Sequence, residues 1–469
     1  MSLVEISGVV VLVYFVVLNL SYASFTVVAW RSLVAHRRSQ DSLTSDEVFR
    51  SPLTPPVSIL LPAFNEAAGV VESVRSLLQL RYPEFEMIVV DDGSTDDTLK
   101  ALTEAFNLVE VEKVTPPGLS FAPIRRVLVS AKHPELSVIS KQNGGKADAL
   151  NCGLTFGRFP YVCAVDADAI LEPDALLRVM SPIIDDRSVV AAGGIVRIAN
   201  GCEVDHGNVT RVGLPRSPLP TMQVVEYLRA FLVGRVGWGE LRALLIISGA
   251  FGVFKRSVVM SVGGYSTDTV GEDMELVVRM HRQLRRSGTA YRVAFVPDPV
   301  AWTEAPETLA VLGRQRRRWQ RGLMETLWRH RGIVVDRRQG ILAWLAVPYY
   351  VLFEVLGPLV ELFGYVVVPI AGAWGVLDIE FVIAFFAVSV VWGVMLSVSA
   401  VALEELTFRR YPLRREVLRL AWYALIDNFG YRQLTTWWRL HGIVEFLRGR
   451  KDWGVMPRRG FGSREVRSS

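Results

Sequence analysis

Long apolar runs lie towards both ends of the chain. Residues 6–30 carry no charge over 25 residues, which is long enough to cross a hydrocarbon core of about 30 Å at roughly 1.5 Å per residue. Two further runs are residues 341–373, which contain three prolines, and residues 381–403, which are uncharged throughout. The pattern predicts three membrane-spanning helices.

The residues around these runs indicate their orientation. A cleaved signal peptide is an alternative for the first run, but the segment ahead of it holds Glu5 and no Lys or Arg, and the run is too long. Arg31, Arg37 and Arg38 follow the run, and basic residues mark the cytoplasmic side of a membrane helix. We therefore expect a multi-pass protein of the cell (inner) membrane, with the block between the first two runs in the cytoplasm.

This central block alternates short apolar runs with amphipathic segments. The runs VSILLP from Val57, FEMIVVD from Phe85 and YVCAV from Tyr161 are apolar on both faces, as in strands of a parallel sheet covered by helices. The segment AFNEAAGVVESVRSLLQL between the first two has the spacing of an amphipathic helix. We therefore predict an α/β fold with a doubly wound sheet.

Two amphipathic segments flank the later apolar runs. Residues 307–332 place Leu, Trp and Met at helical spacing among arginines, which is typical of a helix on the inner membrane face. Residues 418–447 are largely apolar but carry Asp427 and Arg432 near their centre, and such groups are costly against lipid. Because basic residues lie on both sides of this segment, we predict a helical hairpin that enters the membrane without crossing it.

These patterns divide the chain into consecutive parts. A membrane helix comes first, followed by a linker, the α/β domain, the interface helix, a second membrane region and a basic tail. The predicted bounds are 1–32, 33–55, 56–305, 306–335, 336–447 and 448–469.

Composition narrows the classes of function. The formal net charge is +5 over 469 residues, which is too modest to argue for nucleic acid. Three cysteines without CxxC spacing, Cys152, Cys163 and Cys202, indicate buried thiols in a reducing compartment. The six histidines show no paired metal-ligand spacing, so we expect no zinc site.

Polar residues follow the predicted strands at the ends where open parallel sheets bind ligands. Because these ends share one edge of the sheet, the side chains should converge on one crevice. They are Asn65 and Glu66, Asp91 and Asp92, and Asp166 and Asp168.

Asp166 and Asp168 stand two residues apart, so both side chains can leave the strand end on the same side. Close carboxylates repel unless a cation lies between them, and oxygen ligands of this kind suit Mg²⁺ or Mn²⁺ bridging to substrate phosphates. A turn that caps the following helix is an equally good explanation of the pair at this point.

Four other residues have a chemical and a structural explanation side by side. Asp92 can accept hydrogen bonds from a base or ribose, although turn formation and capping account for part of the charge in VVDDGSTDDT. Lys146 can contact a diphosphate or be a surface lysine, since KQNGGKADAL lacks the Walker spacing. Glu272 and Asp273 begin a helix, where the helix dipole favours negative charge, but a carboxylate near a metal also suits a general base.

Six motifs, in this order, resemble those of one enzyme family. They are PAFNE, VVDDGSTDDT, GGKADALN, VDADA, GEDMEL and QRRRW. Over residues 56–322 the chain resembles the family-2 glycosyltransferases, and with its membrane helices it resembles the processive synthases of cellulose, hyaluronan and poly-N-acetylglucosamine. The resemblance implies a GT-A-type doubly wound mixed sheet in the cytoplasm, with α-helical transmembrane segments and amphipathic interface helices.

The resemblance also implies roles in binding the donor. Uridine would contact Asp92 with Glu66, and the diphosphate would lie near Lys146 and be held by Arg318. Asp168 would be the main ligand of a Mg²⁺ or Mn²⁺ ion. Asp166 would serve both the metal and the donor.

The same resemblance implies the residues of catalysis and acceptor binding. Asp273 matches the family's catalytic base, although this chain has Gly271 where the family motif has Thr, at a position without an acid–base role. The acceptor sugar would contact Trp319, Gln315 and Glu272.

The implied activity is inverting transfer from a UDP-sugar, UDP-N-acetylglucosamine or UDP-glucose, to a growing β-linked polysaccharide, coupled to its export. The implied partners are the UDP-sugar donor, a polysaccharide or glycolipid acceptor, the lipid bilayer and an accessory export subunit. One alternative is transfer of a single sugar to a polyprenyl phosphate lipid. Another is a non-catalytic sugar-nucleotide-binding membrane subunit, which the intact Asp166, Asp168 and Asp273 disfavour.

Two acidic residues lie within the second apolar run. Glu354 and Glu361 are seven residues apart, on one helical face. We expect them to face the same interior and to line a polymer channel, with local pairing between polar residues as the alternative.

Overall fold

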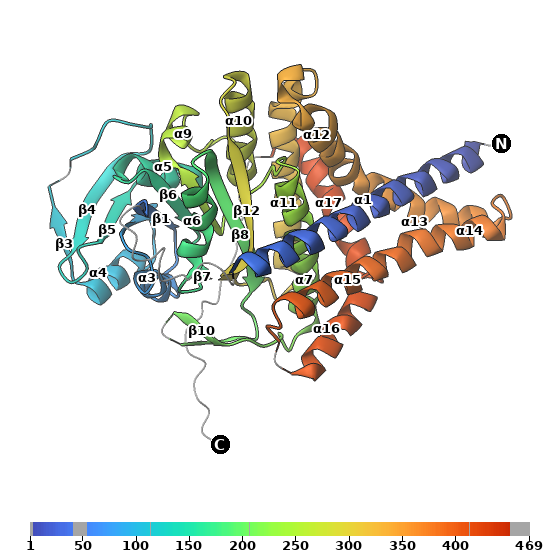
Figure 1. The fold of residues 1–469 in the computed structure, drawn as a ribbon, viewed down its shortest axis with the longest axis horizontal. Coiled ribbons are helices and arrows are strands. Elements are labelled where there is room, and N and C mark those ends of the chain that lie inside the picture. The colour runs from blue at the N-terminus through green and yellow to red at the C-terminus, as the bar shows by residue number, and fades with distance from the viewer. Residues whose placement is uncertain (1–2, 41–53, 113, 206, 412, 451–469) are drawn as a thin grey trace. The chain divides into compact units, whose positions relative to one another are not determined.

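The protein divides into two compact units, each described here by itself. The computed structural model describes residues 3–40, 54–112, 114–205, 207–411 and 413–450 (Figure 1). Among these, the sheet unit comprises residues 36–40, 54–212 and 244–305, and the helical unit comprises residues 3–35, 213–243 and 306–450. Residues 41–53 of the predicted linker (33–55) and residues 451–469 of the predicted basic tail (448–469) lie outside the described residues.

The sheet unit is built on one mixed ten-stranded sheet, in the order β3-β4-β5-β2-β1-β6-β11-β8-β12-β7. Its strands are β1 (Val57–Ala63), β2 (Phe85–Asp91), β3 (Leu108–Val111), β4 (Ile124–Ser130), β5 (Leu136–Lys141), β6 (Tyr161–Val165), β7 (Ala169–Leu171), β8 (Val189–Ile198), β11 (Phe251–Lys255) and β12 (Arg292–Thr303). Parallel pairing joins β5, β2, β1 and β6, whereas β4 and β11 pair antiparallel to their neighbours. The predicted α/β fold with a mixed sheet is confirmed.

Helices cover this sheet with their apolar faces. In the helix between β1 and β2, Val70, Val74 and Leu77 recur at helical spacing and are fully buried, as the amphipathic pattern predicts. The helices are α3 (Val70–Leu78), α4 (Thr98–Phe106), α5 (Lys146–Phe156), α6 (Ala175–Asp185), α9 (Arg256–Ser261) and α10 (Glu272–Arg286). A small separate hairpin joins β9 (Glu203–Asp205) to β10 (Asn208–Arg211).

The unit boundaries differ from the predicted ones at residues 213–243. This segment lies within the predicted α/β domain, but the structure places it in the helical unit as α7 (Pro218–Tyr227), η1 (Leu228–Arg235) and α8 (Val236–Glu240). Arg229 pairs with Asp427 at 3.1 Å and Glu226 with Arg316 at 2.7 Å. Because these partners lie far away in the chain, the local sequence pattern of residues 213–243 does not reveal that the segment belongs to the helical unit.

The helical unit holds long apolar helices. Two are long and apolar enough to cross a membrane, Ile6–His36 within α1 (Leu3–Gln40) and Ile379–Thr407, which joins α14 (Ile379–Phe386), η6 (Ala387–Val391) and α15 (Trp392–Thr407). A third candidate is the pair Leu342–Val355 and Gly357–Ala373 (α13), bent by 41°. The bend coincides with Pro358 near the start of α13, because proline lacks the N–H of a continuing helix.

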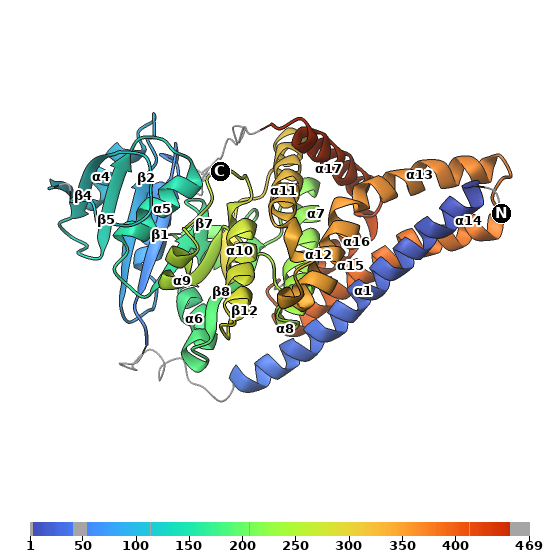
Figure 2. The same cartoon turned by 90° about the horizontal axis from the view of Figure 1, so that it is seen from above.

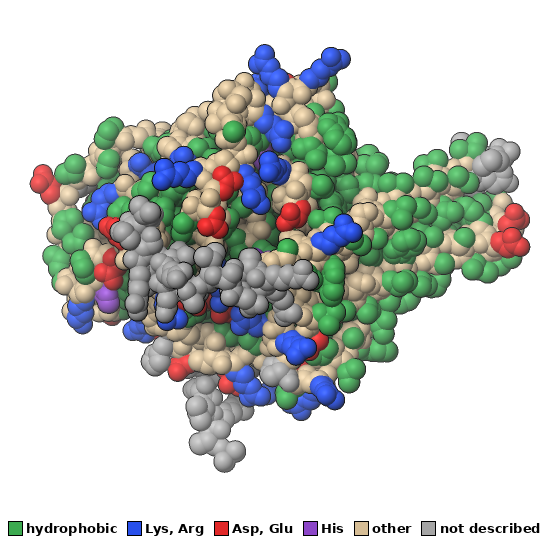
Figure 3. Space-filling view, viewed as in Figure 1, with side chains coloured by type: hydrophobic (Ala, Val, Ile, Leu, Met, Phe, Trp, Pro, Cys, Tyr) green, Lys and Arg blue, Asp and Glu red, His purple; other side chains and the backbone are tan. Residues whose placement is uncertain are grey.

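The apolar surface of these helices agrees with contact to lipid. Val11 and Phe15 of α1 pack with Val368 of α13 and Phe385 of α14, and both ribbon views show the three helices together (Figures 1 and 2). Hydrophobic side chains cover their outer surface (Figure 3), where Val10 is 62% exposed. Such a large apolar surface is costly in water and stable in a bilayer.

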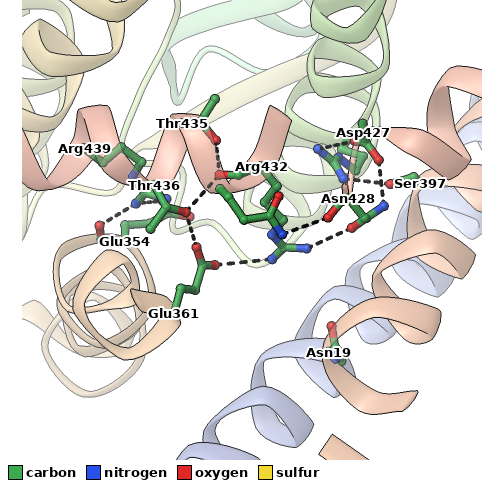
Figure 4. Close-up of polar contacts among 12 residues, drawn as sticks. Asn19, Glu354, Glu361, Ser397, Asp427, Asn428, Arg432, Thr435, Thr436 and Arg439 are labelled. Carbon is green, nitrogen blue, oxygen red and sulfur yellow. Dashed lines mark hydrogen bonds and ion pairs between the residues drawn. The ribbon is translucent and has the colours of Figure 1, made fainter. Parts of the chain in front are cut away.

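The predicted helical hairpin is present. α16 (Arg414–Ile426) and α17 (Tyr431–Leu447) are joined by a short turn that contains Asp427 and Asn428, both buried. Arg432 donates to Glu361 at 3.4 Å and to Asn428 at 3.3 Å (Figure 4). Its entry into a membrane stays a prediction.

Glu354 and Glu361 each have a partner on the hairpin. Arg439 pairs with Glu354 at 2.9 Å, and Arg432 and Thr436 both contact Glu361 (Figure 4). These contacts are the local pairing that was the alternative to a channel lining. The polymer channel stays a prediction.

Burial of His281 should make the stability of the protein depend on pH. Its ring bonds to the Leu244 carbonyl at 2.9 Å and to the Tyr291 hydroxyl at 2.6 Å, and burial lowers its pKa from 6.5 to about 4. Between pH 6.5 and about pH 4, His281 therefore binds a proton in the unfolded chain but not in the folded chain. Stability should fall as pH drops through this window, by up to about 3 kcal/mol from this group.

Thermal unfolding of the full chain in detergent, measured from about pH 7 to about pH 4, tests this expectation. His281→Gln should lower the midpoint at neutral pH but flatten its dependence on pH. His441→Gln, at an exposed histidine on α17, should leave the wild-type slope intact. Equal slopes in wild type and His281→Gln would refute the assignment.

Candidate active site

Four parallel strands end at one edge of the sheet. Ala63 of β1 is in register with Asp91 of β2, and Asp91 with Ser140 of β5. On the other side of β1, Leu60 is in register with Ala164 of β6. The polar segments that follow these strands therefore start from neighbouring positions, as expected for the ligand-binding edge of an open sheet.

The loops after β1 and β2 are tied together by side chains. Asn65, in the left-handed region with φ of 55°, accepts a hydrogen bond from the Thr95 amide at 2.8 Å. Asp96 accepts one from the Ala67 amide at 3.2 Å. Asp91 accepts from the Ser94 amide at 3.1 Å. Much of the negative charge in VVDDGSTDDT thus serves to hold backbone N–H groups in two loops.

Asp92 is buried and holds a third loop. Its carboxylate accepts hydrogen bonds from the amides of Gly144 at 3.0 Å and Gly145 at 2.7 Å, and from the ammonium of Lys141. Burial raises its pKa, although these hydrogen bonds act in the opposite direction. Lys141 is itself fully buried and also pairs with Asp148 at 2.6 Å. Asp92 therefore fixes the segment that leads into α5, and its contact with uridine stays a prediction.

Lys146, the first residue of α5, lies among carboxylates. Its ammonium is 2.6 Å from Asp166 and 3.2 Å from Glu272, and its side chain is 18% exposed. Burial alone would lower the pKa of Lys146, but Asp166, Glu272 and Asp273 raise it above its ordinary value. The surface-lysine alternative does not fit this setting.

Asp273, at the start of α10, is held by two backbone amides. One carboxylate oxygen accepts from Gly249 at 3.1 Å and the other from Met274 at 2.7 Å. The negative charge also lies at the N-terminus of α10, where the helix dipole is favourable. The Asp273 carboxylate therefore stabilises the start of α10, and the same contacts hold it in one orientation.

The lack of a side chain at Gly249 leaves space for the Lys146 ammonium and the Asp273 carboxylate. A Cβ at this position would lie 2.9 Å from the Lys146 ammonium and 3.4 Å from the nearer Asp273 oxygen. The first distance is shorter than side chains normally allow. The absence of a side chain at Gly249 therefore sets how closely Lys146 approaches the loop before β11.

Asp166 and Asp168 lie on the short connection between β6 and β7. They do not cap α6, which begins later at Ala175, after β7. Among the described residues, no group of three or more His, Cys, Asp or Glu side chains is arranged to hold a metal ion. Two aspartates nevertheless suit Mg²⁺ or Mn²⁺, which often take the rest of their ligands from substrate phosphates and water. The donor set fits such an ion.

Of the remaining predicted residues, three lie on α11 (Leu309–Arg329) in the helical unit. Trp319 is 45% exposed. Gln315 and Arg318 are half-buried on the same stretch of helix. Glu66, in the sheet unit, is half-buried in the loop after β1, where its amide donates to the Thr98 hydroxyl at 2.9 Å.

Two site residues escape prediction from the sequence. Lys141 ends β5 and is the first residue of KQNGGK, and its only local signal was that it is a charged residue closing an apolar strand. Gly249 stands in an ordinary small-residue stretch, IISGAFG. Both act through partners distant in sequence, Asp92 and Asp273.

Two family models match the chain. The model described as Glycosyl transferase family 2 matches residues 58–229, and the one described as Glycosyl transferase family group 2 matches residues 161–396, half of the chain. The chain belongs to the family-2 glycosyltransferases. The sheet with carboxylates at its ligand-binding edge is thus the GT-A-type domain of a family-2 glycosyltransferase, which is an enzyme.

Curated relatives of this family-2 glycosyltransferase include poly-β-1,6-N-acetyl-D-glucosamine synthases. The protein of Staphylococcus aureus strain COL is 28% identical over 275 residues, which cover 58% of this chain and 56% of the relative. That of Staphylococcus epidermidis is 29% identical over the same length. The matched part thus spans about half the length of these relatives.

Solved structures with some likeness include two other transferases. A mannosyltransferase from Pyrobaculum calidifontis, in complex with GDP-Man and Mn²⁺, covers 94% of this chain and 99% of its own, with 18% identity and a TM-score of 0.49. A glucosyl-3-phosphoglycerate synthase from Mycobacterium tuberculosis, with Mn²⁺ and UDP, covers 61% of this chain and 84% of its own, with 18% identity and a TM-score of 0.37.

Two lysines of this family-2 glycosyltransferase should respond differently to the same substitution. Lys141→Met leaves Asp92 and Asp148 buried without their cation, so it should destabilise the protein by about 3–5 kcal/mol. Lys146→Met affects a partly exposed ammonium, so it should cost less stability. Chemical denaturation of both variants in detergent measures the difference. Equal stability of the two variants would contradict a structural role for Lys141.

Proposed function

We propose that this family-2 glycosyltransferase transfers a sugar, with inversion, from a UDP-sugar to a growing β-linked polysaccharide and couples the transfer to export. UDP-N-acetylglucosamine or UDP-glucose is the proposed donor. One observation carries the proposal: Lys146, Asp166, Glu272 and Asp273 form a single cluster in the sheet unit. The names of the staphylococcal relatives support a polysaccharide product.

The donor diphosphate is proposed to bind at Lys146, with Arg318 as a second cation. The carboxylates of Asp166 and Glu272 balance the Lys146 ammonium. A diphosphate offers competing negative charge, and charge-assisted hydrogen bonds to phosphate are strong. Lys146 is therefore suited to move from its carboxylate partners to the substrate.

Asp166 and Asp168 are the residues that would hold a Mg²⁺ or Mn²⁺ ion. When bound, such an ion supplies positive charge that stabilises a leaving diphosphate. The nucleoside is assigned to Glu66 and to Asp92, which also shapes the loop around Gly144 and Gly145.

Asp273 is the proposed general base. It takes the proton of the acceptor hydroxyl as that oxygen forms a bond to the anomeric carbon and the bond to the diphosphate breaks. The amides of Gly249 and Met274 hold the two carboxylate oxygens in place, which limits the motion of the base. Attack from the side opposite the leaving group gives inversion.

Acceptor binding is assigned to Trp319, Gln315 and Glu272. An exposed indole offers an apolar face against which the C–H groups of a sugar ring can pack. We further propose a multi-pass arrangement in the cell membrane, with the sheet unit in the cytoplasm and an accessory subunit assisting export. The apolar outer surfaces of α1, α13 and α14 support membrane insertion.

Asp273→Asn should abolish transfer while leaving UDP binding nearly unchanged, because the base acts on the acceptor. A loss of about 10²–10⁴-fold in transfer is typical of removing a general base. Purified protein with a panel of UDP-sugars and Mg²⁺ or Mn²⁺ gives the activity, and calorimetry gives the UDP affinity.

Asp97→Asn is the matched control for Asp273→Asn, since Asp97 also stands at a helix start but its side chain makes no capping bond. It should keep full activity. If Asp273→Asn loses nucleotide affinity along with activity, the assignment to the base is wrong. A lipid-linked monosaccharide as the product would replace the polysaccharide proposal by the polyprenyl alternative.

Asp168→Ala should remove the effect of metal on nucleotide binding. In wild type, Mn²⁺ should strengthen UDP binding. In the variant, UDP affinity measured with Mn²⁺ should be at least about tenfold weaker than in wild type, since even residues that only contact metal ligands contribute that much. Calorimetry with and without Mn²⁺ measures it. Asp174→Asn, at an aspartate before α6 that pairs with Arg81, should behave as wild type. Rescue by excess Mn²⁺ would argue against direct ligation.

A further inference from the structure

Arg316 is a buried charge on α11, the helix that also carries Gln315 and Trp319, two of the residues assigned to the acceptor. Its side chain is only 4% exposed, and Nη2 donates to Glu226 at 2.7 Å. The Tyr431 hydroxyl donates to the same Glu226 oxygen at 2.7 Å. The Glu226 carboxylate of α7 thus accepts hydrogen bonds from an arginine of α11 and from a tyrosine at the start of α17.

The guanidinium of Arg316 also lies over the ring of Trp319. Its Cζ atom is 4.3 Å from the centre of the indole, which is close contact for a cation and an aromatic face. In the described part of the chain, Nε and Nη1 of Arg316 are buried without a hydrogen-bond partner. Contact with the electron-rich indole face offsets part of this desolvation.

This contact restricts Trp319. An indole on a helix surface can change rotamer easily when nothing holds it. Here Arg316 lies over the ring and is itself fixed by Glu226, while Trp319 as a residue stays 45% exposed. The exposed part of the ring is therefore offered in one orientation.

The contacts that hold Arg316 continue into the helical hairpin formed by α16 and α17. Asp427, four residues before Tyr431, pairs with Arg229 at 3.1 Å, and Arg229 also donates to Ser397 at 2.7 Å. α7 and η1 therefore hold both ends of the hairpin turn, through Glu226 and Arg229. Any shift of the turn acts on Glu226, and through it on Arg316.

The neighbouring arginine has a different role. Arg317 pairs with Glu445 of α17 at 3.1 Å, and its side chain is 32% exposed. It belongs to the same helix and carries the same charge, but its ion pair lies at the far end of α17. It provides a matched comparison for Arg316.

We propose that Arg316 is a positioning residue of the transfer reaction: held by Glu226 and Tyr431, it orients Trp319 so that the indole can receive the acceptor sugar. The inference rests on the proposed function, because that function gives Trp319 its acceptor. Lysine at position 316 keeps the charge but lacks the planar group that packs on the ring.

The kinetic test uses Arg316→Lys, with Arg317→Lys as the control. Arg316→Lys should lower kcat/KM for the acceptor by about tenfold, the scale of a desolvated cation–aromatic contact combined with misplacement of a substrate. Hydrolysis of the donor without acceptor, and the KM for the donor, should stay near wild type. Arg317→Lys should change none of these. In a Trp319→Ala background, Arg316→Lys should have no further effect on acceptor use.

A structural readout decides the positioning without activity. With 5-fluorotryptophan labelling, the ¹⁹F resonance missing from Trp319→Phe identifies Trp319. This resonance should shift or broaden in Arg316→Lys and Glu226→Gln but not in Arg317→Lys.

The outcomes separate the two proposals. An unmoved resonance in Arg316→Lys, or equal losses of hydrolysis and transfer, or a full effect in the Trp319→Ala background, would overturn the role of Arg316. Failure of wild type to transfer from any UDP-sugar would overturn the proposed function instead. The fluorine signal would still decide whether Arg316 orients Trp319.

Discussion

Several buried charges in both units lie beside opposite charges, because a lone ion out of water costs several kcal/mol. In the sheet unit, Lys141 lies between Asp92 and Asp148, and this pairing fixes the loop that leads to Lys146. In the helical unit, Glu226 holds Arg316. The pairs do more than neutralise charge. Two of them, Asp92 with Lys141 and Glu226 with Arg316, join residues 49 and 90 positions apart. The geometry of the site therefore follows from where its charges find partners.

Local patterns were enough to predict the framework of the sheet unit. Apolar runs such as VSILLP and FEMIVVD are β1 and β2, and the polar residues after them start from one edge because parallel register aligns the strand ends. The cluster around Lys146 was foreseen only as separate candidates. Its pairing with Asp166 and Glu272 depends on contacts between residues 20 to 126 positions apart, which no local spacing encodes.

In the helical unit, too, local patterns predict the elements but not the pairing of their charges. The apolar runs and the hairpin follow from hydrophobicity and from the position of Asp427. The sequence placed Glu354 and Glu361 on one face, but the arginines that pair with them come from α17. Residues 213–243 belong to the helical unit, although the sequence prediction grouped them with the sheet, for the same reason. Their neighbours along the chain are strands, whereas the charges that fix Glu226 and Arg229 lie beyond residue 310.

The pairing of Glu361 with Arg432 has a consequence for biosynthesis. The two residues are 71 positions apart, and a ribosome adding roughly 5–20 residues per second needs about 4–14 seconds to reach the second after the first. During that interval α13 holds a carboxylate whose arginine has not yet been made. Because an unpaired carboxylate is costly against lipid, the proposed membrane insertion of α13 requires Glu361 to stay near water during this interval. Completion of α17 is then the event that gives Glu361 its partner, and the proposed insertion of α13 into a membrane depends on it.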